Sequence, residues 1–314
     1  MRIGLVVDSG CDLPKDFIDA NNILVMPVPI RIGKEIYVDD RDPQRAREFY
    51  SRHEVDKNHD AETSPPSVEQ IRTLFLEKAA STFDFALVQT VPKSRSPIFD
   101  NASEAAHSIL SDYKKYRAAA GLEGPFRIRV SDSQTLFAGQ GVLAAETIRL
   151  INEGMKVGDI RQRINDLTPR TTGYAVVPDL YYVHKRARKK GDKSVGFMGA
   201  MMGAALDIKP ILCARQDQTF PVAKVRGFEQ AVETMFRHAC KCIEQGLLAP
   251  IVCVSYAGDT DAVYQMPGFE TFKACAEKHD IELLVSHMGL TGGVNIGPGA
   301  ISVGLISDQE KFTG

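Results

Sequence analysis

Four short segments rich in hydroxyl and carboxyl side chains stand where predicted strands end. They are Asp8–Gly10, Thr63–Ser67, Lys93–Pro97 and Asp132–Ser133. Ligands of open parallel sheets bind beyond the carboxyl ends of the strands, so these segments predict a polar crevice at that edge. Each segment also has a purely structural interpretation, because Asp and Ser oxygens accept hydrogen bonds from the first N–H groups of a following helix.

Ser96 and Pro97 fit both interpretations. Ser at the N-cap and Pro at the first helical position favour a helix start, and the unpaired N–H groups of a helix start attract anions. The pair therefore predicts either a helix start alone or a helix start that also contacts a carboxylate.

Several familiar catalytic motifs are missing. The sequence has no GxGxxG after its first strand, no phosphate loop ending in Gly-Lys-Ser/Thr and no GxSxG nucleophile elbow. Its histidines lack the spacing of metal ligands, and His287 either reaches a cleft or lies in a polar loop. We therefore expect no metal, no cofactor and no ATP binding by this chain alone.

The elements that position these residues begin with strands and helices in alternation. This order predicts crossover units and a parallel sheet covered on both faces. The expected strands are Arg2–Asp8, Ile23–Ile30, Asp84–Val91 and Phe126–Ser131, and the expected helices are Val68–Ala80, Pro97–Ala120 and one ending at Ile151.

Beyond about residue 170 the expected strands lie closer together and partly form hairpins, which predicts a mixed sheet. The expected strands are Gly173–Val177, Ile208–Cys213, Phe220–Arg226, Ala249–Ala257, Ile281–Ser286 and Ala300–Ile306. The expected helices are Leu180–Lys190, Gly196–Leu206, Phe228–Gly246 and Asp261–His279. We predict an α/β protein of two domains, a parallel-sheet domain at 1–170 and a mixed-sheet domain at 171–314, with a ligand cleft between them.

Composition narrows the class of protein. The 314 residues carry 38 basic and 40 acidic side chains, a balance that argues against a dedicated nucleic-acid binder. No apolar run reaches the ~18 residues of a transmembrane helix, and the N-terminus lacks the pattern of a signal peptide. Six widely spaced cysteines in mostly apolar segments indicate reduced thiols and a cytoplasmic location.

Taken in order, short motifs along almost the whole chain resemble the DegV family. They are D-S-x-x-D-L-P at Asp8–Pro14, a Gly, Tyr and Asp-Asp segment at Gly33–Asp40, T-S-x-P-S at Thr63–Ser67, an Asp-Ser helix start at Asp132–Gly141, L-x-I-K-P at Leu206–Pro210, K-x-R-G at Lys224–Gly227 and G-P-G at Gly297–Gly299. Each motif is short, but their order and spacing together are specific.

The resemblance implies a two-domain α/β fold that holds one long-chain fatty acid between its domains. It also implies that the chain presents the carboxylate to a separate ATP-binding kinase subunit. The implied ligand-binding residues are Thr63 and Ser64 of T-S-x-P-S, Ser96, Asn295 and Gly297. The resemblance further places Arg226, in K-x-R-G, on the side that faces the partner.

This chain departs from the family pattern around the head group. Pro97 replaces a residue with a backbone N–H, and Asn295 stands where relatives have a His, so it can donate a hydrogen bond but cannot become a cation. Leu180–Lys193 replaces the usual L-x-x-L-x-x-G-G-R-I run and adds cations. The charges of Lys185–Lys190 fit either a solvated helix C-terminus or a docking surface for an anionic partner.

Two other functions remain open from the sequence. One is a self-sufficient hydrolase or acyltransferase that uses Ser96 or Cys11 as nucleophile, and the other is a regulatory protein that its lipid stabilises. A lipid tunnel would suit flexible apolar side chains. Those of Phe197, Met198, Met201 and Met202 are candidates, with ordinary interdomain core as the alternative.

Overall fold

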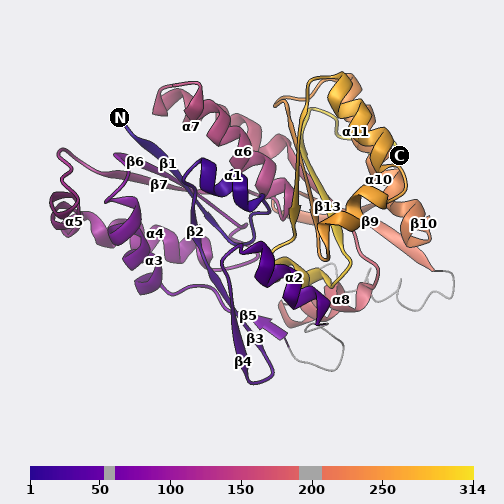
Figure 1. The fold of residues 1–314 in the computed structure, drawn as a ribbon, viewed down its shortest axis with the longest axis horizontal. Helices are drawn as coiled ribbons and strands as arrows, with labels where there is room; N and C mark the ends of the chain where they lie inside the picture. Colours follow the sequence, from indigo (N-terminus) through magenta and orange to yellow (C-terminus); the bar gives the residue numbers. More distant parts are fainter. Residues whose placement is uncertain (53–60, 191–206) are drawn as a thin grey trace.

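The computed structural model describes residues 1–52, 61–190 and 207–314 (Figure 1). The helix expected at Gly196–Leu206, with the proposed tunnel residues Phe197, Met198, Met201 and Met202, lies outside the described residues. The described part is a mixed α/β fold with three sheets. None of its helices is long and apolar enough to cross a membrane.

The N-terminal part forms a four-stranded parallel sheet. Its order is β2 (Leu24–Met26), β1 (Ile3–Asp8), β6 (Phe85–Thr90) and β7 (Arg127–Asp132). β6 is buried along its whole length and β1 along all but its first residue, as expected for central strands covered on both faces. The predicted parallel sheet is therefore confirmed.

Helices cover both faces of this sheet because successive side chains of β1 point to opposite sides. Val6 belongs to the core formed with α3 (Val68–Leu74), α4 (Ile98–Ser108) and α5 (Tyr113–Ala119). Leu5 and Val7 belong instead to the core formed with α1 (Lys15–Ala20), α6 (Ala138–Asn152) and α7 (Val157–Leu167).

The C-terminal part forms a six-stranded mixed sheet, which confirms the second sheet prediction. Its order is β10 (Gln218–Arg226), β9 (Ile208–Arg215), β8 (Thr171–Val176), β13 (Ile301–Ile306), β11 (Ile251–Tyr256) and β12 (Glu282–His287). Only β11 and β12 pair in parallel within it. α10 (Phe228–Gln245) and α11 (Phe269–Lys278) pack on one face.

Two helices predicted as continuous are interrupted, so those predictions are wrong. Pro97–Ala120 divides into α4, a 3-10 turn at Ile109–Ser111 and α5. Asp261–His279 divides into a 3-10 turn at Thr260–Gln265 and α11. In the second case Pro267 lacks an N–H and Gly268 adopts φ 82°, so the backbone turns before α11 begins.

α6 lies between the two large sheets, as Figure 1 shows. It contacts β1 of the first sheet and β8, β11 and β13 of the second. The approach to β13 requires glycine, because a Cβ on Gly304 would lie 1.9 Å from the carbonyl oxygen of Ala138. The proposed division into domains at residues 170 and 171 stays a prediction, and α6 belongs to the core of both sides.

A small antiparallel sheet lies below the four-stranded sheet in the view of Figure 1. The sequence analysis did not predict its two outer strands. β3 (Val28–Ile32) pairs with β4 (Glu35–Asp39) and with β5 (Ala61–Thr63). α2 (Pro43–Ser51) follows β4, and its apolar face packs with α8 (Leu180–Lys190) and α12 (Leu290–Ile296). α2, α7 and α12 were also not predicted.

One buried guanidinium joins the small sheet to both large ones. Arg41 donates from Nη1 to Asp12 Oδ1 at 2.8 Å, and from Nη2 to the carbonyl oxygens of Leu13 at 3.0 Å and His287 at 2.7 Å. The Arg41 and Asp12 side chains are 3% and 0% exposed. The backbone of Arg41 also has φ 64°, in the left-handed region that residues other than glycine rarely adopt.

Backbone N–H groups at the start of α12 complete this network. Gly289 donates to Asp12 Oδ1 at 2.9 Å, and Thr291 donates to Asp39 Oδ2 at 2.8 Å. Burial raises the pKa of both carboxyl groups, while the charge of Arg41 acts in the opposite direction. The position of α12 therefore depends on the same charges that join the sheets.

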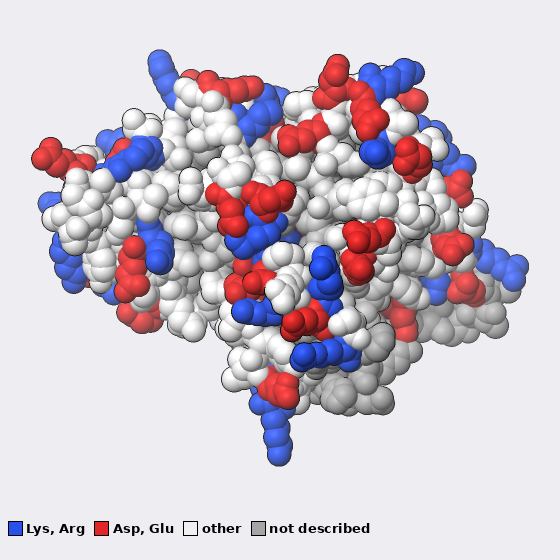
Figure 2. All heavy atoms as spheres, in the orientation of Figure 1, with Lys and Arg blue, Asp and Glu red and all other residues white. Residues whose placement is uncertain are grey.

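Elsewhere the surface is mixed in charge. On the face drawn in Figure 2, basic and acidic side chains are interspersed, in keeping with the formal net charge of -2.

We expect Arg41→Ala to destabilise the fold by about 3–5 kcal/mol, because it leaves buried carboxylates without their cation. Arg45→Ala is the matched control: the exposed Arg45–Asp40 pair, with side chains 46% and 42% exposed, contributes about 0–1 kcal/mol. Urea unfolding would give both free energies. Equal losses in the two variants would contradict the importance assigned to Arg41.

Candidate functional site

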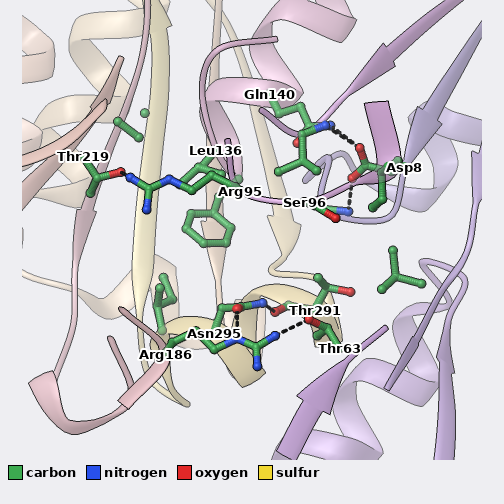
Figure 3. A pocket seen from close by; sticks show the side chains of 18 of the residues that line it. Asp8, Thr63, Arg95, Ser96, Leu136, Gln140, Arg186, Thr219, Thr291 and Asn295 are labelled. Atoms are coloured by element: carbon green, nitrogen blue, oxygen red, sulfur yellow. Dashed lines mark hydrogen bonds between the residues drawn. The ribbon is translucent and has the colours of Figure 1, made fainter. Parts of the chain in front are cut away.

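A cavity of about 250 Å³ lies between the strand ends of the first sheet and the face of the second. Most of its described wall is apolar, formed by Val28, Pro65, Val91, Pro97, Ile98, Leu136, Phe137, Ala175, Val183, Leu212, Ala214 and Ile296. The polar members of the wall are few and gather in separate places, and Figure 3 shows several of them from close by.

Three side chains from distant parts of the sequence meet at one side of the cavity. Thr63 ends β5, Arg186 lies on α8 and Asn295 lies on α12. Arg186 donates from Nη2 to Thr63 Oγ1, and from Nε to Asn295 Oδ1 at 2.6 Å. Asn295 in turn donates from Nδ2 to the carbonyl oxygen of Thr291 at 2.6 Å, which fixes its amide (Figure 3).

Ser96 lines the cavity opposite this group, but it does not begin the next helix. α4 starts at Ile98 with Pro97 at the N-cap, and among the described residues no side chain caps that start. The predicted N-cap role of Ser96 is therefore wrong by one residue. Its backbone N–H donates to the carbonyl oxygen of Pro92 at 3.2 Å, so the loop itself holds Ser96 in the wall.

Asp8 is a buried carboxyl group in the same wall. It accepts hydrogen bonds from the backbone N–H groups of Val91 at 2.5 Å and Gly10 at 2.9 Å, and from Gln140 Nε2 at 3.2 Å. Burial raises the pKa of Asp8 to about 6, although these three donors act to lower it. Asp8 is thus mostly ionised at neutral pH and becomes neutral under mildly acidic conditions.

The loop before α4 also reaches across the cavity to the hairpin between β9 and β10. Arg95 donates from Nη2 to Thr219 Oγ1 at 3.0 Å, and the Ser94 hydroxyl bonds to Asp217 Oδ1 at 2.5 Å. Burial lowers the pKa of Arg95, and the nearby charge of Asp217 opposes that effect. These contacts join the N-terminal and C-terminal parts on this side of the cavity.

The structure brings together only some of the predicted site residues. Thr63, Ser96 and Asn295 line the cavity, whereas Ser64 and Gly297 are not among its lining residues. Ser64 donates its N–H to the Pro29 carbonyl oxygen at 2.9 Å and so extends the pairing of β5. Gly297 ends α12 with φ 92°, and a Cβ there would lie 2.5 Å from the ring of Tyr182.

Of the four predicted polar segments, three contribute to the cavity. The fourth segment does not. Asp132 lines a different cleft of about 490 Å³ together with Lys93, and the buried Ser133 donates a hydrogen bond from its hydroxyl to the carbonyl oxygen of Thr135. Arg226 is exposed at the end of β10 remote from Thr219 and does not line the cavity. Its predicted contact with a partner stays a prediction.

Arg186 is the site residue that the sequence analysis missed. It belongs to the basic run of Lys185–Lys190, which was interpreted only as a solvated or docking surface. A signal was present, because Val183 and Arg186 are three residues apart on one helix face, and both line the cavity.

Other candidate chemical groups lie outside the cavity wall. Cys11 is fully buried, and burial raises the pKa of its thiol well above the usual range, so the thiol stays protonated. His287 lines a polar cleft beside Arg41, with Nδ1 3.0 Å from the Gly258 carbonyl oxygen, and burial lowers its pKa. All six cysteines are free thiols. Over the described ranges there is no group of three or more His, Cys, Asp or Glu side chains suited to a metal.

Comparisons with known proteins give consistent results. Residues 2–308 match the family model described as "Uncharacterised protein, DegV family". A DegV domain-containing protein of Xanthomonas axonopodis pv. citri is 47% identical over 313 residues, which cover 100% of both chains.

Solved structures share the fold at low sequence identity. A stearic acid-binding protein from Eubacterium ventriosum superposes with TM-score 0.77 at 21% identity, covering 97% of this chain and 98% of that one. DegV of Bacillus subtilis, described as a fatty acid binding protein, superposes with TM-score 0.74 at 20% identity, covering 98% of this chain and 100% of that one.

The buried carboxyl group in the cavity gives a pH prediction. The pKa of Asp8 is 3.8 before burial and about 6 in the folded chain, so its ionisation costs about 3 kcal/mol of stability above pH 6. This cost is relieved as the pH falls from 6 toward 3.8, because the folded state then binds the extra proton. Asp8→Asn removes this term while leaving the contributions of Asp12 and Asp39.

Urea unfolding at pH 7.5 and pH 4.5 would test this prediction. We expect the change in unfolding free energy between the two pH values to differ by about 2 kcal/mol between wild type and Asp8→Asn, because the carboxyl group of the unfolded chain is still mostly ionised at pH 4.5. An identical change in both proteins would show that Asp8 has an ordinary pKa.

Proposed function

Because this chain belongs to the DegV family, we propose that it binds one long-chain fatty acid in the cavity and presents the carboxylate to a separate kinase subunit. The supporting observation is the division of the cavity wall, which is mainly apolar but has a polar group at Thr63, Arg186 and Asn295. The acyl chain would lie along the apolar part, with its carboxylate toward the polar group.

Burial of the acyl chain supplies most of the affinity in this proposal. Each buried methylene is worth about 0.8 kcal/mol, so about fourteen give at most about 11 kcal/mol before ordering costs. The head group then needs only enough hydrogen bonds to orient the acid. Thr63 and Ser96 supply hydroxyl donors at the wall, while Ser64 extends the pairing of β5 and Gly297 ends α12.

The kinase part of the proposal comes from the resemblance to the DegV family. The sequence has no phosphate-binding loop of the Gly-Lys-Ser/Thr type, which is in keeping with ATP being brought by another protein. The bound fatty acid is the only ligand in this proposal, and no cofactor takes part. The free thiols suit a reducing compartment, and we therefore propose a cytoplasmic location.

Native mass spectrometry of the purified protein is the direct test of lipid binding. We expect an added mass equal to one long-chain fatty acid, lost on delipidation and regained on incubation with the acid. A protein that carries no lipid and takes none up would contradict the proposal.

Thr63→Val should weaken fatty-acid binding about 10-fold to 100-fold, because valine keeps the shape but removes a hydrogen bond to a charged group. Thr234→Val is the matched control. Thr234 lies on α10 and bonds to the Gln230 carbonyl oxygen at 2.7 Å, away from the cavity. Titration calorimetry with delipidated protein would measure both. Equal affinities in the two variants would remove Thr63 from the site.

Arg226→Glu should slow the association with the kinase subunit and reduce its salt dependence, since charges at the rim of an interface mainly steer encounter. Arg237→Glu is the control, because Arg237 is exposed on α10 and bonds to Thr234 Oγ1 at 3.2 Å. The measurement is acyl-phosphate formation with a fatty-acid kinase subunit and ATP, at unchanged lipid content. If Arg226→Glu also lost its lipid, Arg226 would belong to the fold or the pocket.

A further inference from the structure

We propose that Cys240 and Cys275 form a reversible disulfide bond when the protein reacts with a low-molecular-weight disulfide such as oxidised glutathione. Cys240 lies on α10 and Cys275 lies on α11, and both are free thiols in the structure. The bond would join the two helices that cover one face of the six-stranded sheet. This inference is independent of the proposed fatty-acid binding, because no residue of these two fully described helices lines the cavity.

The packing of α10 against α11 determines where the two thiols lie (Figure 1). The rings of Phe236 on α10 and Phe272 on α11 are stacked with their centroids 5.1 Å apart, and both side chains are fully buried. Cys240 follows Phe236 by four residues. Cys275 follows Phe272 by three. Each cysteine therefore lies one turn further along the same helix face as its aromatic neighbour.

The two cysteines are already in contact across this helix interface. The Cys275 thiol donates to the carbonyl oxygen of Cys240, with its sulfur 3.8 Å from that oxygen. Burial raises the pKa of the Cys240 thiol to about 12, and the Cys275 thiol acts in the same direction through its charge and through a hydrogen bond between the two side chains. The two thiols are thus close enough to interact with each other.

Exposure to solvent separates this pair from the other cysteines. Cys240 and Cys275 are only partly buried at the border of the apolar core under α10 and α11, so a small disulfide can reach them. The other four thiols are at most 4% exposed, and they are those of Cys11, Cys213, Cys242 and Cys253. Because buried thiols of this kind are inert, an oxidant in solution should modify the pair alone.

The reaction is a thiol–disulfide exchange in two steps. Since the raised pKa keeps Cys240 protonated, the thiolate of Cys275 attacks one sulfur of oxidised glutathione, forms a mixed disulfide and releases one glutathione thiolate. Cys240 then loses its proton, and its sulfur attacks the Cys275 sulfur and releases the second glutathione thiolate. Two protein thiols are oxidised to one disulfide, oxidised glutathione is reduced to two thiols, and the two protons lost by the protein go to the released thiolates.

Peptide mapping of the oxidised protein tests the proposal directly. Trypsin cuts after Lys and Arg, so it releases Cys240 in the peptide 238–241 and Cys275 in the peptide 274–278, while Cys242 goes to a different peptide. We expect wild type treated with excess oxidised glutathione to lose the mass of two hydrogen atoms and to yield these two peptides linked to each other. Excess reduced glutathione should reverse both changes.

Serine variants separate the two steps. Cys240→Ser should stop at the mixed disulfide of Cys275 with one glutathione. Cys275→Ser should react more slowly, because burial still raises the pKa of its remaining thiol. Cys242→Ser is the matched control and should form the bond as wild type does. It lies on α10, keeps both thiols of the pair, and has His238 Nε2 at 3.5 Å from the present sulfur as a partner for its hydroxyl.

Two further measurements show what the bond changes. Oxidised wild type should unfold at a higher urea concentration than the reduced protein, because the bond closes a loop in the unfolded chain. Its affinity for hexadecanoic acid should not change, since neither helix lines the cavity.

Several outcomes would overturn the proposal. They are an unmodified wild type, a linked peptide from another pair of cysteines, a bond between two copies of the chain, and a wild type that keeps one glutathione on Cys275 without exchanging it. If a serine variant does not fold, the peptide map of wild type decides alone. A protein that forms the linked peptides but binds no fatty acid would contradict the proposed function and leave this inference intact.

Discussion

The arrangement of the whole chain depends on one buried guanidinium. Arg41 follows β4, yet it donates to Asp12 beyond β1 and to the carbonyl oxygen of His287 at the end of β12. Burying a charge costs several kcal/mol unless it is well paired, so an arrangement that kept Arg41 buried away from these partners would be strongly disfavoured. Because Gly289 also donates to Asp12, the network fixes where the polypeptide enters α12.

From that fixed point the polar side of the cavity follows step by step. α12 carries Asn295, whose amide orients Arg186 on α8, and Arg186 in turn contacts Thr63 at the end of β5. The three residues come from three elements far apart in the sequence. They meet because α2, α8, α12 and the small sheet share one apolar core, so the position of this polar group in the cavity wall results from packing around the Arg41 network.

Local patterns sufficed to predict the strands of the two large sheets, the parallel and mixed character of those sheets, and three of the four polar segments at the cavity. They failed where tertiary contacts decide. β5 has only three residues and exists because Ile30 pairs with Thr63, a contact that no local pattern predicts. Arg186 was interpreted as part of a solvated basic run. Which side of α8 faces the cavity depends on the elements packed against the helix, and a local pattern does not contain them. Thr63 and Asn295 came from the resemblance to a family, and their contact through Arg186 was visible only in three dimensions.

α6 has a consequence for how the chain folds. Its buried residues run around the whole helix, from Ala138 to Leu150, as in a helix enclosed on all sides. Gly304 lets its backbone touch β13 directly. If either large sheet were missing, one side of α6 would be exposed to solvent. The core of the remaining sheet would therefore be incomplete. The two halves should therefore melt in a single cooperative transition, and a fragment cut after residue 170 would be left with an uncovered, aggregation-prone surface.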